Sequence, residues 1–299
     1  AVMQPHVIRE STAPYSSHTD RIKRTPNDMN FLPLFLKQLR NSRTSTLLNL
    51  LGLTIALSSF IILIAQVRYE LTYDTHFRDA DRIFRIEIDV PTELGVYSPL
   101  LCRPLGERML ASSPDIEAGG VMAIPQRVSV HDFAKGEKDG AGHTLYRISR
   151  SMFDVLGTEI VAGDIDRFDD SRGTVILSQS AARSIFGSAD PIGKSVVVNG
   201  DETHPGEVIA VCRDCPDNSS FQANSLFTNI LDESIEDYGE FSYIYFIKAV
   251  RTGNPARIAA DLGQSVESMS ARSQDESAFR VRCTPVSQMH FMRDIRFDF

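Results

Sequence analysis

The sequence predicts an α+β protein with one N-terminal transmembrane helix and a large domain outside the membrane. Two observations lead to this fold class. Thr44–Val67 is a run of 24 residues without a charged side chain. The 232 residues from Arg68 to Phe299 then mix alternating strand patterns, helical patterns and hairpin turns, which is typical of α+β domains.

The uncharged run is long enough to cross a bilayer. As a helix that rises about 1.5 Å per residue it would reach roughly 36 Å, against a hydrocarbon core of about 30 Å. A core helix of a soluble protein normally has a polar face, and a signal peptide has an apolar core of about 7–15 residues. The polar residues here are uncharged and mostly small, and the run continues into a polar helix-like segment. A membrane span is therefore favoured over both alternatives.

The charges on either side predict the orientation of the span. Residues 1–43 contain seven Lys/Arg and three Asp/Glu, whereas residues 68–299 contain 24 and 36. Because basic residues are retained on the cytoplasmic side, Lys37, Arg40 and Arg43 directly before the span favour a cytoplasmic N-terminus. The acidic outer domain argues against a nucleic-acid partner, which would require a basic surface.

The region before the span has two parts. Residues 1–28 are polar, contain three prolines and lack apolar periodicity, so we expect a disordered N-terminal extension. Residues 29–43 read as a short amphipathic lead-in on the cytoplasmic side. The predicted domains are then the transmembrane helix, 44–67, and the extracytoplasmic domain, 68–299.

Alternation and apolar runs predict the strands of the outer domain. Arg82–Val90 alternates apolar and charged residues, which indicates a half-buried strand. Tyr243–Val250 is almost continuously apolar, so we expect it at the centre of a sheet. Gly120–Val130 is predicted as one further strand. Shorter strands are expected at Thr174–Leu177, Val196–Val198, Glu207–Val211 and Phe279–Cys283, with Asn199-Gly200 as a hairpin turn.

Capping signals predict the helices. Ser178 is expected to cap a helix that Gly187 ends, and Asn254 to cap one that begins at Pro255. Pro99–Ser112 reads as a third helix. We also expect Arg68–Phe77 to continue the membrane helix outward, because neither Gly nor Pro intervenes after Gly52. Residues three or four apart share a helical face, so Tyr69 with Tyr73, or Leu71 with Asp74, are the pairs to consider.

Four blocks together resemble one protein family. Asn49–Glu87, NLLGLTIALSSFIILIAQVRYELTYDTHFRDADRIFRIE, resembles the first transmembrane helix and stalk of bacterial permeases of the MacB/FtsX type. Val175–Gly200, VILSQSAARSIFGSADPIGKSVVVNG, and Val208–Phe221, VIAVCRDCPDNSSF, resemble that family's extracytoplasmic core domain. Thr284–Phe291, TPVSQMHF, is similar to the stretch before the second span. The resemblance covers roughly residues 29–299 in the family's order.

The resemblance implies a permease subunit of an ATP-binding-cassette (ABC) system in the bacterial inner (plasma) membrane, without enzymatic activity of its own. In such systems ATP binding on a separate cytoplasmic ATPase subunit closes a dimer, and stalk helices transmit the motion to the outer domain and drive export. The outer domain is expected to have two lobes, a larger α/β lobe and a small β-rich lobe inserted at about residues 145–220. The stalk positions that match the family, and that we expect to couple the motion, are Glu70, Tyr73, Asp74 and Phe77.

The partners implied by the resemblance are the ATPase subunit, membrane lipid and a second permease copy in a homo- or heterodimer. A periplasmic adaptor or an outer-membrane channel is a further candidate. The alternative function is a single-span sensor or receptor whose extracytoplasmic domain binds a ligand. Further apolar spans after Phe299 would favour the permease, and a cytoplasmic signalling helix pair would favour the sensor.

Three motifs resemble chemical sites. Gly187–Ser195, GSADPIGKS, has five residues between its glycines where a phosphate-binding loop has four, and it follows a helix, so Asp190–Gly193 is read as a turn. Cys212 and Cys215 have C-x-x-C spacing at the end of a strand, where a local disulfide and two free thiols both remain open. Cys102 and Cys283 add no second pair for zinc.

The remaining titratable residues show no catalytic pattern. The seven histidines lack metal-ligand spacing, and His76 lies in the stalk block. The acidic cluster Asp164, Asp166, Asp169 and Asp170 lacks the glycine and terminal glutamate of a calcium loop, so we interpret it as a solvated surface loop. We therefore expect no catalytic site, no cofactor and no metal.

Overall fold

The computed structural model describes Pro33, Lys37 and residues 43–89, 96–136, 140–168, 173–230, 235–270 and 280–295. The chain divides into two units, residues 1–63 and residues 64–299. The predicted extension 1–28 lies outside the described residues, as does nearly all of the lead-in 29–43.

Helix α2 (Arg43–Leu71) contains the predicted span. It has 29 residues, and a mean hydropathy of 2.4 in its most apolar window. The hydroxyls of Thr54 and Ser59 donate to the carbonyls of Leu50 (2.7 Å) and Ile55 (2.8 Å), so they need no outside acceptor. Within the described ranges this is the one helix long and apolar enough to cross a membrane.

The helix ends earlier than the sequence predicts. It stops at Leu71, and residues 72–76 form turns, so the expected continuation through Phe77 is wrong. Asp74 has a φ of 55°, a left-handed conformation that cannot continue an α-helix. The helix ends here without Gly or Pro, because side-chain hydrogen bonds from a loop distant in sequence hold Asp74 in this conformation. This loop is described below.

Strand β12 (Tyr243–Ala249) is central, as its apolar run predicts. It pairs antiparallel with β1 (Ile83–Asp89) and with β4 (Ile116–Ala123), and every residue in it is buried. Alternate side chains pack on opposite faces of the sheet: Ile244 and Phe246 belong to one apolar cluster, and Tyr245 belongs to another. A strand covered on both faces needs an unbroken apolar sequence.

Strand β1 is buried on both faces, so the predicted half-buried strand is wrong. Glu87 is fully buried and accepts hydrogen bonds from Arg85 Nε (2.9 Å), Arg282 Nε (2.8 Å) and Thr284 Oγ1 (2.7 Å). The two arginines and the threonine compensate the charge that burial would otherwise penalise. Arg282 and Thr284 come from β13 (Val281–Pro285), which pairs with β1.

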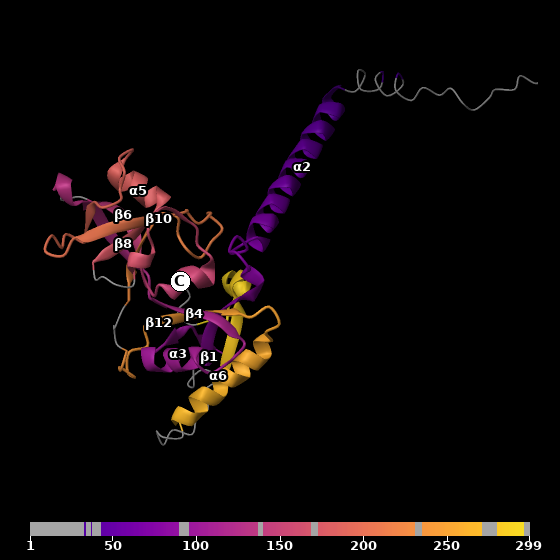
Figure 1. Cartoon of the computed structure of the whole chain (residues 1–299). Coiled ribbons are helices and arrows are strands. Elements are labelled where there is room, and N and C mark those ends of the chain that lie inside the picture. Colours follow the sequence, from indigo (N-terminus) through magenta and orange to yellow (C-terminus); the bar gives the residue numbers. More distant parts are fainter. Residues whose placement is uncertain are drawn as a thin grey trace, which may run out of the picture. The chain divides into compact units, whose positions relative to one another are not determined.

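Two helices cover one face of this part of the sheet. Helix α3 (Arg103–Leu110) begins with Pro104 in its first turn, and α6 (Pro255–Ser270) begins where Asn254 Oδ1 accepts from Ala256 N (2.9 Å), as predicted. Figure 1 shows α3 and α6 beside β1, β4 and β12. The short strands β2 (Tyr97–Ser98) and β3 (Leu100–Leu101) pair with β1 and β12.

The other end of the sheet closes on itself. The ring consists of six strands, paired in this order: β5 (Gln126–Asp132), β6 (Ala141–Ile148), β11 (Ser225–Asn229), β8 (Thr174–Ser178), β10 (Gly206–Cys212) and β9 (Ser195–Val198), with β9 pairing back to β5. Helix α5 (Gln179–Phe186) packs against the ring, and β7 (Ile160–Gly163) pairs with β10. The predicted inserted lobe of about 145–220 contains β8, β9 and β10, and its identity as a separate lobe stays a prediction.

Local signals around the ring are confirmed, with one correction. Ser178 Oγ accepts from Ala181 N, and Gly187 ends α5. Asn199 and Gly200 both have positive φ, as a tight hairpin turn requires. The predicted single strand Gly120–Val130 is instead two strands, β4 and β5. Pro125 lies between them, and its missing N–H cannot join a ladder of hydrogen bonds.

Five short helical segments complete the described structure, one α-helix and four 3₁₀ turns. Helix α4 (Ser151–Leu156) packs against β4 and β12. The 3₁₀ turns are η1 (Ala80–Arg82), η2 (Phe133–Lys135), η3 (Asp166–Phe168) and η4 (Val286–Phe291). Of these, η4 takes part in the candidate site.

Candidate functional site

Three segments that are distant in sequence meet at the end of helix α2. We call this contact the junction and define it as residues 66–77, 217–221 and 286–291, which all lie in the second unit of the chain. The first segment ends α2, the second is the loop after β10, and the third is η4. Each segment lies within one of the sequence blocks that predict the function, and the junction contains all four predicted coupling residues.

Asp74 is the centre of the junction. Its side chain is fully buried, and its carboxylate accepts hydrogen bonds from Ser219 Oγ (3.0 Å), Ser220 N (2.8 Å) and Ser220 Oγ (2.6 Å). Its own N–H donates to Asn218 O (2.9 Å). A buried carboxylate is costly unless donors surround it, and here the donors come from a loop about 145 residues further along the chain. The end of α2 is thereby fixed to that loop.

The same loop covers the polar groups at the C-terminal end of the helix. Asn218 Nδ2 donates to both the carbonyl and the hydroxyl oxygen of Thr72 (3.0 Å each). The hydroxyls of Tyr69 and Tyr73 donate to the carbonyls of Asp217 (2.9 Å) and Ser219 (3.2 Å). Carbonyls at a helix end lack intrahelical partners, and Asn218 supplies one.

Segment η4 contacts the end of α2 through His290. The His290 ring stacks on the Tyr73 ring at a centroid distance of 3.8 Å, and His290 Nε2 lies 2.7 Å from Glu70 Oε2. Gln66 Nε2 donates to the other Glu70 oxygen (2.7 Å). The predicted pair Tyr69–Tyr73 is confirmed, with ring centroids 6.4 Å apart. The predicted pair Leu71–Asp74 is wrong, because Asp74 turns towards the serines.

Phe77 connects the junction to the core. It is buried, and its ring meets the edge of Phe221 at 5.6 Å. Phe221 in turn contacts Phe246 of the central strand β12, at 6.0 Å, and Tyr146 of the ring strand β6, at 5.5 Å. A displacement of the helix end would therefore reach both parts of the sheet through closely packed aromatic rings.

Burial sets the acid–base properties of the junction. Burial raises the pKa of the Tyr73 hydroxyl, and the neighbouring Asp74 carboxylate adds to the rise. Burial also raises the pKa of Tyr146, which contacts Phe221 of the junction, to about 12. Both hydroxyls therefore stay protonated and act as hydrogen-bond donors or acceptors at neutral pH. His76 lies in the segment 66–77 of the junction, with its ring centroid 4.0 Å from that of Phe77.

The C-x-x-C motif lies immediately before the junction loop. Cys212 ends β10 and is buried, Cys215 is half-buried, and both are free thiols in the structure. Burial raises the pKa of Cys212 to about 12 and that of Cys215 to about 11, the opposite of what a reactive thiolate requires. The possible disulfide between them stays a prediction.

The other predicted features are found away from the junction. Gly187–Ser195 connects α5 to β9, with Ile192 N donating to Asp190 Oδ1 (3.1 Å) in the predicted turn. Asp164 Oδ1 accepts from Asp166 N (2.9 Å), whereas Asp169 and Asp170 lie outside the described residues. The described residues contain no group of three or more His, Cys, Asp or Glu arranged to hold a metal ion.

Sequence reasoning missed half of the junction. Asn218, Ser219, Ser220 and His290 were part of matching blocks, but no local pattern assigned them a contact with residues 69–74. The signal of Asn218, Ser219 and Ser220 is a run of short polar side chains after a buried strand, which is common in surface loops. Only the fold shows that this loop covers the end of α2.

The comparisons with known proteins agree with this architecture. Residues 46–269 match the family model of the MacB-like periplasmic core domain, and the chain belongs to this family. The family is a component of ABC transporter permeases, not an enzyme of the classical kind, and the single-span sensor is not favoured.

Individual relatives match only in part. The Macrolide export ATP-binding/permease protein MacB of Aggregatibacter actinomycetemcomitans is 30% identical over 117 residues, which cover 38% of this chain and 16% of that protein. A domain from Porphyromonas gingivalis, described as part of a permease, is 19% identical with a TM-score of 0.57, covering 75% of this chain and 96% of that one. The periplasmic region of MacB from Actinobacillus actinomycetemcomitans is 20% identical with a TM-score of 0.48, covering 68% and 88%.

Proposed function

We propose that this chain is a permease subunit that couples ATP hydrolysis by a separate cytoplasmic ABC ATPase to a conformational change of its outer domain and to export. The observation that carries the proposal is the junction. A helix can transmit motion to a domain only if its end is fixed to that domain. The buried Asp74 carboxylate and the Phe77–Phe221 contact fix the end of α2 to the 217–221 loop and the core of the outer domain. The family membership supports the same function.

The proposed topology places residues 1–43 in the cytoplasm and residues 68–299 outside the bacterial inner membrane. The charge difference across the span supports it. A cysteine engineered at Asp201, in the exposed turn after β9, should react with a membrane-impermeant maleimide in intact cells, and one at Asn30 should not. Labelling of position 30 together with protection of position 201 would reverse the orientation.

The proposed assembly contains the ATPase subunit and a second permease copy, in a homo- or heterodimer, embedded in lipid. A periplasmic adaptor or an outer-membrane channel is a further proposed partner. Movement of the two outer domains, each with a larger α/β lobe and a smaller β-rich one, would then follow the closing of the ATPase dimer.

Asp74 offers a direct test of the coupling. The full chain should be purified with its ATPase in lipid nanodiscs, and hydrogen exchange of the outer domain measured with and without ATP. We expect ATP to change exchange in residues 217–221 and 286–291 of the wild type. Asp74→Ala should abolish that response while ATP hydrolysis continues, because the helix end is no longer fixed to the loop.

A matched control separates coupling from folding. Asp201→Ala also removes a carboxylate that accepts from a hydroxyl and a backbone N–H, but in an exposed turn. It should leave the ATP response intact. A full ATP response in folded Asp74→Ala would show that the junction does not transmit the motion.

A further inference from the structure

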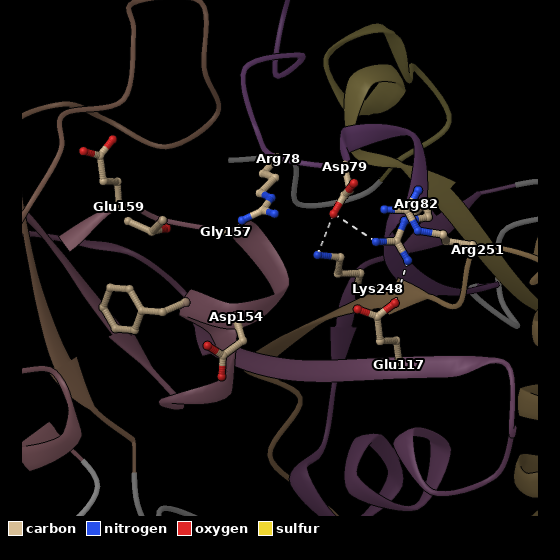
Figure 2. Close-up of a pocket in the computed structure, with 11 residues that line it drawn as sticks. Arg78, Asp79, Arg82, Glu117, Asp154, Gly157, Glu159, Lys248 and Arg251 are labelled. Carbon is tan, nitrogen blue, oxygen red and sulfur yellow. Dashed lines mark hydrogen bonds and ion pairs between the residues drawn. The ribbon is translucent and has the colours of Figure 1, made fainter.

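A second polar site lies directly after the junction. The pocket drawn in Figure 2 is formed by the segment 78–82, Glu117 of β4, the end of α4 with its following loop, and the end of β12 with the turn after it. Its cavity volume is about 820 Å³. Phe153 is the one large apolar side chain that lines it, and the other lining residues are charged apart from Gly157 and Thr158. Such a lining suits a polar ligand and disfavours a large apolar one.

The carboxylates of the pocket already have basic partners. The Asp79 carboxylate lies 2.9 Å from both Arg82 and Lys248. The hydrogen bond from Lys248, and then that from Arg82, lower the pKa of Asp79 to about 2. The other three pairs are Glu117 with Arg82 (2.5 Å), Asp154 with Arg150 (3.1 Å) and Glu159 with Arg213 (2.6 Å). The acidic groups are therefore neutralised by residues of the protein itself.

Two arginines of the pocket are not used in this way. Arg78 and Arg251 are both exposed, and neither forms a hydrogen bond or an ion pair with any residue that the structure describes. Each guanidinium presents five N–H donors in a planar fork. The pocket thus contains surplus donors and positive charge after its internal pairs are counted.

The walls that carry these arginines are well fixed. Arg82 also donates to Ala249 O (2.8 Å), which ties the segment before β1 to the end of β12, two residues before Arg251. Gly157 has a φ of 64°, and a Cβ there would lie 2.9 Å from the Cβ of Arg78. Glycine therefore allows Arg78 to lie directly against the loop after α4, as Figure 2 shows.

We propose that this pocket binds the anionic group, a carboxylate or a phosphate, of a small polar solute, with Arg78 and Arg251 as the binding donors. The arginine fork matches both groups in size and shape and can bind them through two parallel hydrogen bonds. The volume accommodates a solute as large as a short peptide. This binding does not depend on the proposed transport function.

Arginine footprinting on the unmodified full chain tests the proposal. The protein in detergent is treated with phenylglyoxal, which reacts with accessible guanidinium groups, and the modified arginines are identified by mass spectrometry. The probes are inorganic phosphate, tri-alanine and tri-alanine amide at millimolar concentration and low salt. We expect at least one of the two anionic probes to protect Arg78 and Arg251 several-fold, while Arg257, an exposed arginine of α6 that does not line the pocket, stays reactive.

The probes distinguish the two sources of negative charge. Protection by phosphate alone assigns a phosphate-bearing solute, and protection by tri-alanine without protection by its amide assigns a carboxylate. Failure of both anionic probes to protect, or equal protection of Arg257, overturns the proposal, as does equal protection by the amide.

Paired variants provide a second measurement. Calorimetric titration of the protecting probe should show at least a tenfold loss of affinity in the variant Arg78→Gln with Arg251→Gln. Arg257→Gln should bind as the wild type does. Unchanged affinity in the double variant overturns the proposal, and if that variant does not fold, the footprint on the wild type decides.

Discussion

Asp74 and Asp79 lie five residues apart, and both adopt the left-handed conformation, with φ of 55° and 62°. Their surroundings are nevertheless opposite. Asp74 is fully buried and held by hydroxyl and backbone donors, whereas Asp79 is partly exposed and held by two cations. Neutral donors in a dry site give a fixed and salt-insensitive connection, and cations near water give one that responds to salt and pH.

The largest expected effect is at Asp74. Asp74→Ala removes three hydrogen bonds and leaves the hydroxyls of Ser219 and Ser220 without their acceptor. We expect a loss of about 2–4 kcal/mol in the free energy of unfolding, because buried donors without partners are costly. Urea unfolding of the purified chain measures it, with Asp201→Ala as the exposed control. A loss of less than about 1 kcal/mol would show that Asp74 does not anchor the helix end.

Ser220→Ala should have a smaller effect of the same kind. It removes the 2.6 Å hydrogen bond from Ser220 Oγ but keeps the one from Ser220 N. We expect a loss of about 1.5 kcal/mol, at the lower end of the range for a hydrogen bond to a charged group, because Ser220 N still donates to the carboxylate. Thr203→Ala, which removes a hydroxyl–carboxylate contact in an exposed turn, is the matched control and should change stability far less. Equal effects of the two substitutions would contradict the importance of burial.

The contribution of Asp79 to the stability of the fold should depend on pH. Its pKa is lowered from 3.8 to about 2 in the folded protein, first by Lys248 and then by Arg82. The unfolded chain therefore binds a proton at a higher pH than the folded one, and the stabilisation is fully present above about pH 4 and lost as the pH falls towards 2. Unfolding midpoints of the wild type and Asp79→Asn should differ at neutral pH and converge in acid. High salt should also bring them together, whereas a constant difference would exclude the ion pairs as its cause.

The smallest expected effect is at the half-exposed pair of Glu70 and His290. Solvent screens such pairs, so Glu70→Gln should cost only a few tenths of a kcal/mol. A double-mutant cycle with His290→Ala isolates the interaction from the stacking of His290 on Tyr73. If the interaction energy of Glu70 with His290 exceeds the loss measured for Ser220→Ala, the expectation that the buried contacts of Asp74 contribute more than this half-exposed pair is contradicted.

Features that depend on neighbouring residues could be predicted from the sequence. The span follows from 24 uncharged positions, the central position of β12 from its apolar run, and the starts of α5 and α6 from Ser178 and Asn254. Each is a local pattern with a local physical cause: transfer of apolar groups, burial on two faces, or a side chain that caps backbone N–H groups. The family resemblance was also readable, because it rests on short blocks in a fixed order.

The residue at which α2 ends, and the contacts of that end, follow from the fold as a whole. Residues 68–77 have the composition of a helix, and the chain leaves that conformation because Asp74 gains donors from Ser219 and Ser220, 145 and 146 residues away. His290 reaches Glu70 across 220 residues. The burial of Glu87 has the same origin, since Arg282 and Thr284, which donate to it, lie on β13. Contacts over such separations are decided by the packing of the whole sheet and have no counterpart in any local pattern.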